Sequence, residues 1–359
     1  MTDGSPESTF EELEVLAGQG NVDAQFKLGV MYVNGKGIAK NDLEAVRWWR
    51  LAADQENARA QCNLGVMYED GNGVTKDYAE AVRLYRSAAD QGHAVAQYNL
   101  GIMYANGRGI LKDDAEAVKW YRLAADQENA RAQCNLGFMY ENGRGIPKDY
   151  AEAVKWYRLA ANQGHAGAQC NLGVMYEDGN GVTKDYAEAV KWYRLAADQG
   201  NTDAQYNLSV MYYGGTGVPI DYAEAVKWWR LAADQGHPRA QYNLGVMYAN
   251  GRGTLKDDAE AVKWYGLAAD QGHTGAQCNL GFMCENGRGI PKDYAEAVKW
   301  YRLAADQGNT DAQYNLGVMY ANGTGVTKDD TEAVRWHRLA ADQGHVDAIK
   351  NLELRNNRS

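Results

Sequence analysis

Residues 168–176 are Ala-Gln-Cys-Asn-Leu-Gly-Val-Met-Tyr, and the same nine residues occur at 60–68. Close variants of this segment begin at seven further alanines, always a multiple of 36 residues apart: Ala24, Ala96, Ala132, Ala204, Ala240, Ala276 and Ala312. Self-similarity at a fixed period of this length is typical of an array of stacked structural repeats. We therefore divide residues 24–347 into nine repeats and number the positions of each from 1 to 36, starting at these alanines.

The first part of each repeat predicts an amphipathic helix. Positions 1, 5, 8 and 9 are apolar, and this i, i+4, i+7, i+8 spacing places them on one face of a helix. In repeat 5 they are Ala168, Leu172, Met175 and Tyr176. Glycines at positions 12 and 14 then predict the end of this helix and a turn.

The second part of each repeat predicts another helix. In repeat 5 it begins at Asp185, with Glu188 three residues later, the pattern of a capping box in which each side chain accepts from the other residue's backbone N–H. Its predicted apolar face comprises Ala189, Trp192, Tyr193 and Ala196. Gly200 is expected to end it, and the His or Asn at position 34 is expected to cap the next helix.

The two ends of the chain resemble half-repeats. Residues 5–20, led by Ser5 as a cap and Pro6, align with the second helix alone, and 348–356 align with the first helix alone. Glu353 replaces the usual glycine, and the tail after it is polar, as a solenoid end requires. We therefore expect twenty helices, with an N-terminal cap over 1–23, repeats over 24–59, 60–95, 96–131, 132–167, 168–203, 204–239, 240–275, 276–311 and 312–347, and a capping helix over 348–359.

The pattern A-x-x-x-L-G-x-M-Y-x-x-G-x-G, followed by D-x-x-E-A-V-x-W-Y-R-L-A-A-x-Q-G, resembles the Sel1-like repeat, a relative of the tetratricopeptide repeat. The resemblance implies an all-α, right-handed superhelical solenoid with the first helices on its concave side, acting as an adaptor or scaffold for protein partners. Some relatives serve in secretion or in the cell envelope, and hydrolase activity has been proposed for others. Secreted relatives with two disulfide-bonded cysteines per repeat differ from this chain.

Composition and charge exclude some classes of function. The formal net charge of −10 argues against nucleic-acid binding, which needs a basic face. No apolar run is long enough for a membrane span, and the polar first residues show no signal peptide. We therefore expect a cytoplasmic, monomeric protein that is not bound to membranes.

Cysteine and histidine do not form a pattern typical of catalysis or metal binding. Cys62, Cys134, Cys170 and Cys278 share position 3, Cys284 replaces a tyrosine at position 9, and their spacing suggests unreactive reduced thiols. Five of the six histidines lie at position 34, where asparagine substitutes for them. We predict no metal, no cofactor and no enzyme activity; a weak hydrolase is the alternative.

One side of the first helix carries most of the variation between repeats. Positions 3, 4, 7, 10, 11 and 14 cluster opposite the apolar stripe, since successive residues of a helix turn by about 100°. Apolar and aromatic residues at such a surface indicate a binding groove.

A row of asparagines at position 4 runs through this predicted groove: Asn63, Asn99, Asn135, Asn171, Asn207, Asn243, Asn279 and Asn315. An amide has both donors and an acceptor, so each Asn can pair with a peptide backbone of any sequence. Tyrosines at position 3 lie beside the row and complete the predicted binding site: Tyr98, Tyr206, Tyr242 and Tyr314. The alternative is that these asparagines join one repeat to the next.

Overall fold

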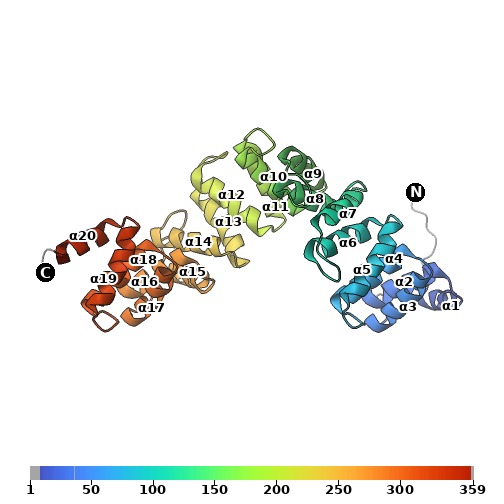
Figure 1. The fold of residues 1–359 in the computed structure, drawn as a ribbon, viewed down its shortest axis with the longest axis horizontal. Coiled ribbons are helices and arrows are strands. Elements are labelled where there is room, and N and C mark those ends of the chain that lie inside the picture. Colours follow the sequence, from blue (N-terminus) through green and yellow to red (C-terminus); the bar gives the residue numbers. More distant parts are fainter. Residues whose placement is uncertain (1–8, 36, 357–359) are drawn as a thin grey trace. The chain divides into compact units, whose positions relative to one another are not determined.

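The computed structural model describes residues 9–35 and 37–356, and within these residues it contains twenty α-helices and no strand (Figure 1). The described residues form two compact bodies, divided between Lys184 and Asp185. The first body contains α1 (Phe10–Gly18), α2 (Val22–Asn34), α3 (Asp42–Asp54), α4 (Ala58–Asp70), α5 (Tyr78–Asp90), α6 (Ala94–Asn106), α7 (Asp114–Ala125), α8 (Ala130–Asn142), α9 (Tyr150–Asn162) and α10 (Ala166–Asp178). The second contains α11 (Tyr186–Asp198), α12 (Thr202–Gly214), α13 (Tyr222–Asp234), α14 (Pro238–Asn250), α15 (Asp258–Asp270), α16 (Thr274–Asn286), α17 (Tyr294–Asp306), α18 (Thr310–Asn322), α19 (Asp330–Asp342) and α20 (Val346–Asn356).

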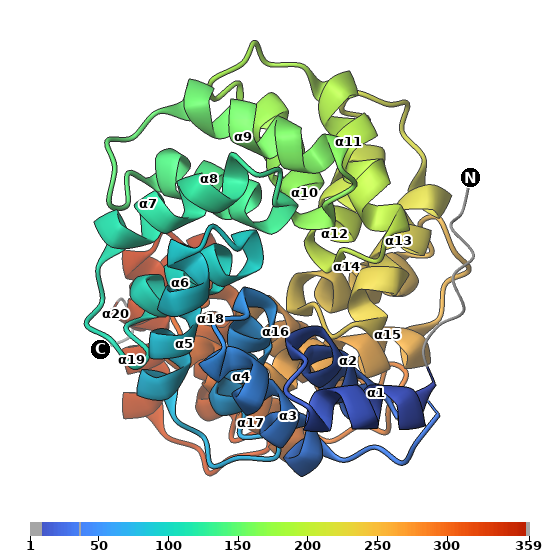
Figure 2. The same ribbon diagram turned by 90° about the vertical axis from the view of Figure 1, so that its right-hand side faces the viewer.

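Each repeat contributes one even-numbered and one odd-numbered helix, in that order, so the prediction of an all-α solenoid is confirmed. Within the first body, α8 and α10 lie on the inner side of the curve traced by α7 to α10, and α7 and α9 lie on its outer side (Figure 2). The first helices of the repeats therefore provide the inner layer of this curve.

The predicted caps of the even-numbered helices are present. The side chain of His93 accepts a hydrogen bond at Nδ1 from the backbone N–H of Ala96, 3.2 Å away, and Asn57 does the same for Ala60 at 2.9 Å. Either side chain therefore satisfies one of the free N–H groups at the helix start.

The odd-numbered helices of the nine repeats, α3 to α19, have only half of the predicted capping box. Asp77 accepts at Oδ1 from the N–H of Glu80, 3.1 Å away, but its own N–H donates to the carbonyl of Tyr68 at 2.9 Å. The Glu80 carboxylate instead pairs with Arg83 on the next turn. The predicted reciprocal bond is thus wrong here, because the end of the preceding helix already satisfies the N–H of the cap.

The only complete capping box in the described residues opens α1, where Thr9 and Glu12 each accept from the other's backbone N–H. This helix therefore begins at Phe10. Ser5 and Pro6, which the sequence suggested as its start, lie outside the described residues.

A glycine at position 6 lets the two helices of a repeat approach closely. A methyl group added at Gly137 would lie 2.7 Å from the ring of Tyr157, which is fully buried against α8. Alanines at positions 1, 22 and 29 and a leucine at position 5 complete the core, as predicted.

Buried glutamine side chains join consecutive repeats. Gln133, at position 2 and 3% exposed, donates from Nε2 to the carbonyl of Ala125 in the preceding repeat at 3.1 Å. Its Oε1 accepts from Nε2 of Gln163, at position 32 of its own repeat, at 2.8 Å. The same amide pair recurs at 2.7–2.9 Å between Gln25 and Gln55, Gln61 and Gln91, Gln97 and Gln127, Gln205 and Gln235, Gln241 and Gln271, Gln277 and Gln307, and Gln313 and Gln343.

A second link between repeats uses the arginine at position 27. Arg50 donates to the hydroxyl of Tyr68 at 2.8 Å, and Arg158 to that of Tyr176 at 2.7 Å. This arginine therefore reaches from its own repeat to the position-9 tyrosine of the next one. Between repeats 7 and 8 both partners are replaced together, by Gly266 and Cys284.

Restoring both partners should restore the link. In a double-mutant cycle of Gly266→Arg and Cys284→Tyr, we expect the double variant to be more stable than the sum of the single effects by about 0.5–1.5 kcal/mol. Chemical denaturation measures each step. In the control cycle, Gly266→Ala with Cys284→Tyr, the two changes in the free energy of unfolding should add. If they also add in the arginine cycle, the introduced arginine and tyrosine do not form the link.

Candidate functional site

The predicted groove is narrower than the sequence suggested. The cysteines at position 3, such as Cys62 and Cys134, are buried in the core instead of facing solvent. Position 14 is also closed: a methyl group on Gly145 would lie 2.2 Å from the backbone of Asp114 in the preceding repeat. Positions 4, 7, 10 and 11 of the even-numbered helices remain partly exposed, and we call these four positions the open face.

A cavity of about 310 Å³ lies in the open face between repeats 3 and 4. Phe138, at position 7, lies at the edge of this cavity, and 42% of the residue is exposed. The lining residues come from α6, α7, α8 and the turn after α8: Ile102, Ala105, Asn106, Tyr121, Asn135, Phe138, Met139 and Arg144. Asn135 of the predicted row therefore lines this cavity, and Asn207 lines another one in the second body.

The eight asparagines at position 4 are all half-buried: Asn63, Asn99, Asn135, Asn171, Asn207, Asn243, Asn279 and Asn315. Burial raises the pKa of Tyr121 to about 12, and a hydrogen bond with Asn135 acts in the opposite direction. Burial likewise raises the pKa of Tyr265 to about 12, and a hydrogen bond with Asn279 lowers it. Asn135 and Asn279 therefore contact the preceding repeat while they remain partly exposed, and ligand binding by the asparagine row stays a prediction.

The four predicted tyrosines at position 3 are also half-buried. Three of them stack on the histidine that caps the next even-numbered helix, with ring centroids 4.4–4.6 Å apart: Tyr206 on His237, Tyr242 on His273 and Tyr314 on His345. Tyr98 lies beside Tyr121 at 6.1 Å. The tyrosines thus lie at the edge of the open face where the even-numbered helices begin.

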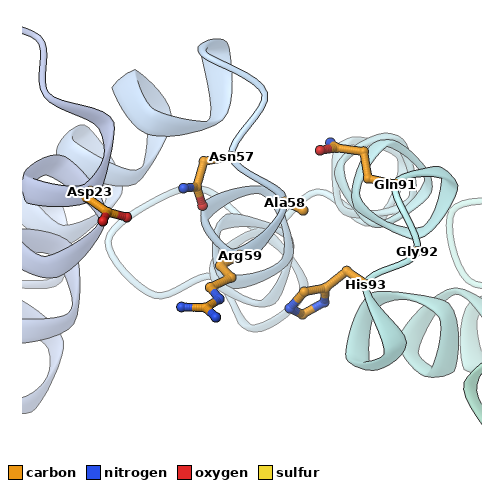
Figure 3. Close-up of a pocket in the computed structure, with 7 residues that line it drawn as sticks. All are labelled: Asp23, Asn57, Ala58, Arg59, Gln91, Gly92 and His93. Carbon is orange, nitrogen blue, oxygen red and sulfur yellow. The ribbon is translucent and has the colours of Figure 1, made fainter. Parts of the chain in front are cut away.

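A second kind of cavity lies at that edge. In the first body it has a volume of about 450 Å³ and is lined by Asp23, Asn57, Ala58, Arg59, Gln91, Gly92 and His93 (Figure 3). Burial lowers the pKa of His93, and the nearby Arg59 lowers it further. His93 is therefore neutral near pH 7, with its proton on Nε2 because Nδ1 accepts from Ala96. The second body has the corresponding cavity, of about 500 Å³, around Tyr206, His237, Arg239 and His273.

Two kinds of repeat differ at position 10 of the open face. Where position 3 is cysteine, position 10 is glutamate, and where position 3 is tyrosine or phenylalanine, position 10 is not glutamate. The structure gives the reason for this glutamate in three repeats: it accepts a hydrogen bond from the position-26 tyrosine. The distances are 2.8 Å from Tyr85 to Glu69, 2.5 Å from Tyr157 to Glu141 and 2.7 Å from Tyr301 to Glu285.

The cavity between repeats 3 and 4 exists where this glutamate is absent, because position 10 is Ala105. Arg144 lies at its rim and is held by two hydrogen bonds to Asp114, at 2.8 and 3.3 Å. Ala105 and Arg144 were not among the site residues predicted from the sequence. The paired occurrence of Cys at position 3 and Glu at position 10 was the available signal.

The described residues contain no group of three or more His, Cys, Asp or Glu side chains placed to hold a metal ion. None of the helices in the described part of the chain is both long and apolar enough to cross a membrane. All five cysteines are buried. Burial raises the pKa of Cys62, Cys134 and Cys278 to about 12, so these thiols are protonated near neutral pH.

Comparison with known proteins points to one repeat family. Nine segments match the family model described as Sel1 repeat: 22–57, 58–93, 94–129, 130–165, 166–201, 202–237, 238–273, 274–309 and 310–345. The crystal structure of c5321, a protective antigen of uropathogenic Escherichia coli with an SLR fold, is 36% identical, with a TM-score of 0.74 over 95% of this chain and 81% of that one. A Sel1 repeat protein from Oxalobacter formigenes is 35% identical, with a TM-score of 0.59 over 68% of this chain and 96% of that one. No curated protein matches the sequence.

The raised thiol pKa values predict slow chemical modification. At neutral pH the thiolate fraction of Cys62, Cys134 and Cys278 is lower than that of a free cysteine by roughly three orders of magnitude, since their pKa is about 12. A colorimetric thiol reagent should therefore react with them only as the chain unfolds or as the pH approaches that value. Reaction at the rate of a free thiol in the folded chain would contradict this, and the denatured chain serves as the control.

Proposed function

The chain belongs to the Sel1-repeat family, whose repeats generally mediate protein–protein interactions, and we propose that it is a scaffold that binds an extended segment of a partner protein along the open face. Its fold is a repeat scaffold of a kind that is typically not enzymatic. The observation that carries the proposal is the cavity between repeats 3 and 4, where exposed apolar side chains lie beside asparagine and arginine.

The exposed apolar side chains of the open face support this proposal. Val66, Phe138, Val210 and Phe282 occupy position 7 of their repeats and are 37–44% exposed. Position 7 is apolar in all nine repeats, and apolar side chains that recur at one position offer a row of contacts to an extended chain. The half-buried asparagines beside them have amide groups that can pair with the backbone of such a segment.

The asparagine row can be tested with the triple variant Asn171→Ala, Asn207→Ala, Asn243→Ala. We expect partner affinity to fall by about one to three orders of magnitude, since each lost hydrogen bond contributes roughly 0.5–1.5 kcal/mol. The partner is first captured with the wild-type chain, and its dissociation constant is then measured for each variant.

A matched control separates binding from folding. Asp185 caps α11 by accepting from the N–H of Glu188 at 3.0 Å and does not belong to the open face. Asp185→Ala should lower stability by about 1 kcal/mol and leave affinity unchanged. If the triple variant lowers the melting temperature but keeps its affinity, the asparagines only join repeats and the binding role is wrong.

A further inference from the structure

Three repeats show how the chain itself satisfies the buried tyrosine at position 26. In repeats 2, 4 and 8, the hydroxyl of Tyr85, Tyr157 or Tyr301 donates to a glutamate carboxylate at position 10 of the same repeat. A phenol that donates to an ionised carboxylate forms a stronger hydrogen bond than one between neutral groups. These repeats therefore serve as an internal template for a carboxylate bound at the open face.

Repeat 3 keeps the tyrosine and lacks the carboxylate. Tyr121 is buried as its counterparts are, but position 10 is Ala105, and the space that a glutamate side chain occupies in the template repeats is part of the 310 Å³ cavity. Arg144 stands at the rim of this cavity. Its position is set by Asp114, and its guanidinium lies 5.9 Å from the ring centroid of Phe138.

We propose that the cavity between repeats 3 and 4 binds a carboxylate of the partner, which takes the place of the glutamate that repeats 2, 4 and 8 supply from within the chain. The inference rests on the proposed function and names the chemistry of one contact. The carboxylate accepts from the hydroxyl of Tyr121 and from Arg144.

The charges and donors of the cavity fit this occupant. The guanidinium has five N–H donors, of which Asp114 takes two, so others are available to a ligand. Because Asp114 fixes the guanidinium plane, little conformational entropy is lost when an anion binds. The exposed ring of Phe138 and the side chain of Ile102 provide apolar contacts for a neighbouring residue of the partner.

The same set of side chains occurs a second time, in the other body. Repeat 7 has Ala249 at position 10 and Tyr265 at position 26, and repeat 8 supplies Asn279, Phe282 and Arg288. Arg288 donates to Asp258 at 2.7 and 3.2 Å and lies 5.9 Å from the ring centroid of Phe282, as Arg144 does at its own site. Hydrogen bonding to Arg288 lowers the pKa of Asp258, which stays ionised and keeps the arginine in place. The proposal thus assigns two equivalent carboxylate sites to each chain.

The test uses short peptides and the full chain. Acetyl-Leu-Glu-Leu-amide, acetyl-Leu-Gln-Leu-amide and acetyl-Leu-Leu with a free terminal carboxylate are titrated while the side-chain N–H signals of Arg144 and Arg288 are followed by NMR. We expect the carboxylate peptides to bind about tenfold more tightly than the glutamine peptide, as a charge-assisted hydrogen bond implies. The tighter of the two carboxylate peptides shows whether a side chain or a chain terminus is the preferred source.

Two variants provide matched controls. Ala105→Glu with Ala249→Glu should fill both sites with the chain's own carboxylates, raise the melting temperature and abolish the preference for carboxylate peptides. Glu69→Ala should create a third site, because it leaves Tyr85 without its acceptor and frees Arg108, which now lies 3.7 Å from Glu69.

The outcomes separate the two proposals. Equal binding of the glutamate and glutamine peptides to the wild-type chain overturns the carboxylate site but leaves a peptide-binding open face. A carboxylate preference that survives Ala105→Glu with Ala249→Glu in a folded chain overturns the location. If none of the peptides shifts a signal of the open face even though the captured partner binds, the carboxylate site is wrong while the scaffold function stands.

Discussion

A buried glutamine amide that cannot be left without hydrogen-bond partners determines how one repeat stacks on the next. Gln133 satisfies its donor with a carbonyl of the preceding repeat and its acceptor with Gln163 of its own repeat. An unsatisfied amide at this depth would destabilise the fold by roughly 1–3 kcal/mol, so a change in the stacking of neighbouring repeats is strongly disfavoured. The same pair of bonds in repeat after repeat gives each body a uniform geometry.

The contacts that stack the repeats and the side chains of the open face lie at different positions of the repeat. Stacking depends on the glutamines at positions 2 and 32, on the close approach of the glycine at position 14 to the preceding repeat, and on the arginine at position 27. Positions 7 and 10 do not supply these recurring bonds, and their side chains differ between repeats. In repeat 3, position 10 is Ala105 and a cavity is present beside it. In repeat 4, position 10 is Glu141, whose carboxylate accepts from Tyr157.

The helices and their order could be predicted from the sequence because each follows from local chemistry: apolar spacing, an Asp or His cap, and a glycine at the end. The hydrogen bonds of the buried glutamines could not be predicted, although glutamine stands at positions 2 and 32 of every repeat, as Gln133 and Gln163 do in repeat 4. A glutamine on a helix is usually solvated, and the burial of this one depends on the preceding repeat. The missing half of the capping box has a similar cause, since the N–H of Asp77 is taken by a carbonyl that the intervening turn brings into place.

The candidate site was only partly accessible to sequence reasoning. Helical periodicity located the asparagine row and the varying face, including Asn135, which does line the cavity. It could not show that Cys134 at position 3 is buried or that Arg144 is held by Asp114, because both depend on contacts between helices. The difference between Glu69 and Ala105 at position 10 of their repeats was visible in the sequence and would have indicated the site.

Amide hydrogen exchange of the Gln133→Met variant tests whether the buried glutamine couples neighbouring repeats. This substitution keeps the size of the side chain and removes its hydrogen bonds, while Leu159→Ala, at an exposed position of the same repeat, serves as the control. If the glutamine couples the repeats, amide exchange should be faster in α7, α8 and α9 of the methionine variant and unchanged in α14 to α17. Protection in α7 to α9 equal to that of the Leu159→Ala variant would contradict it.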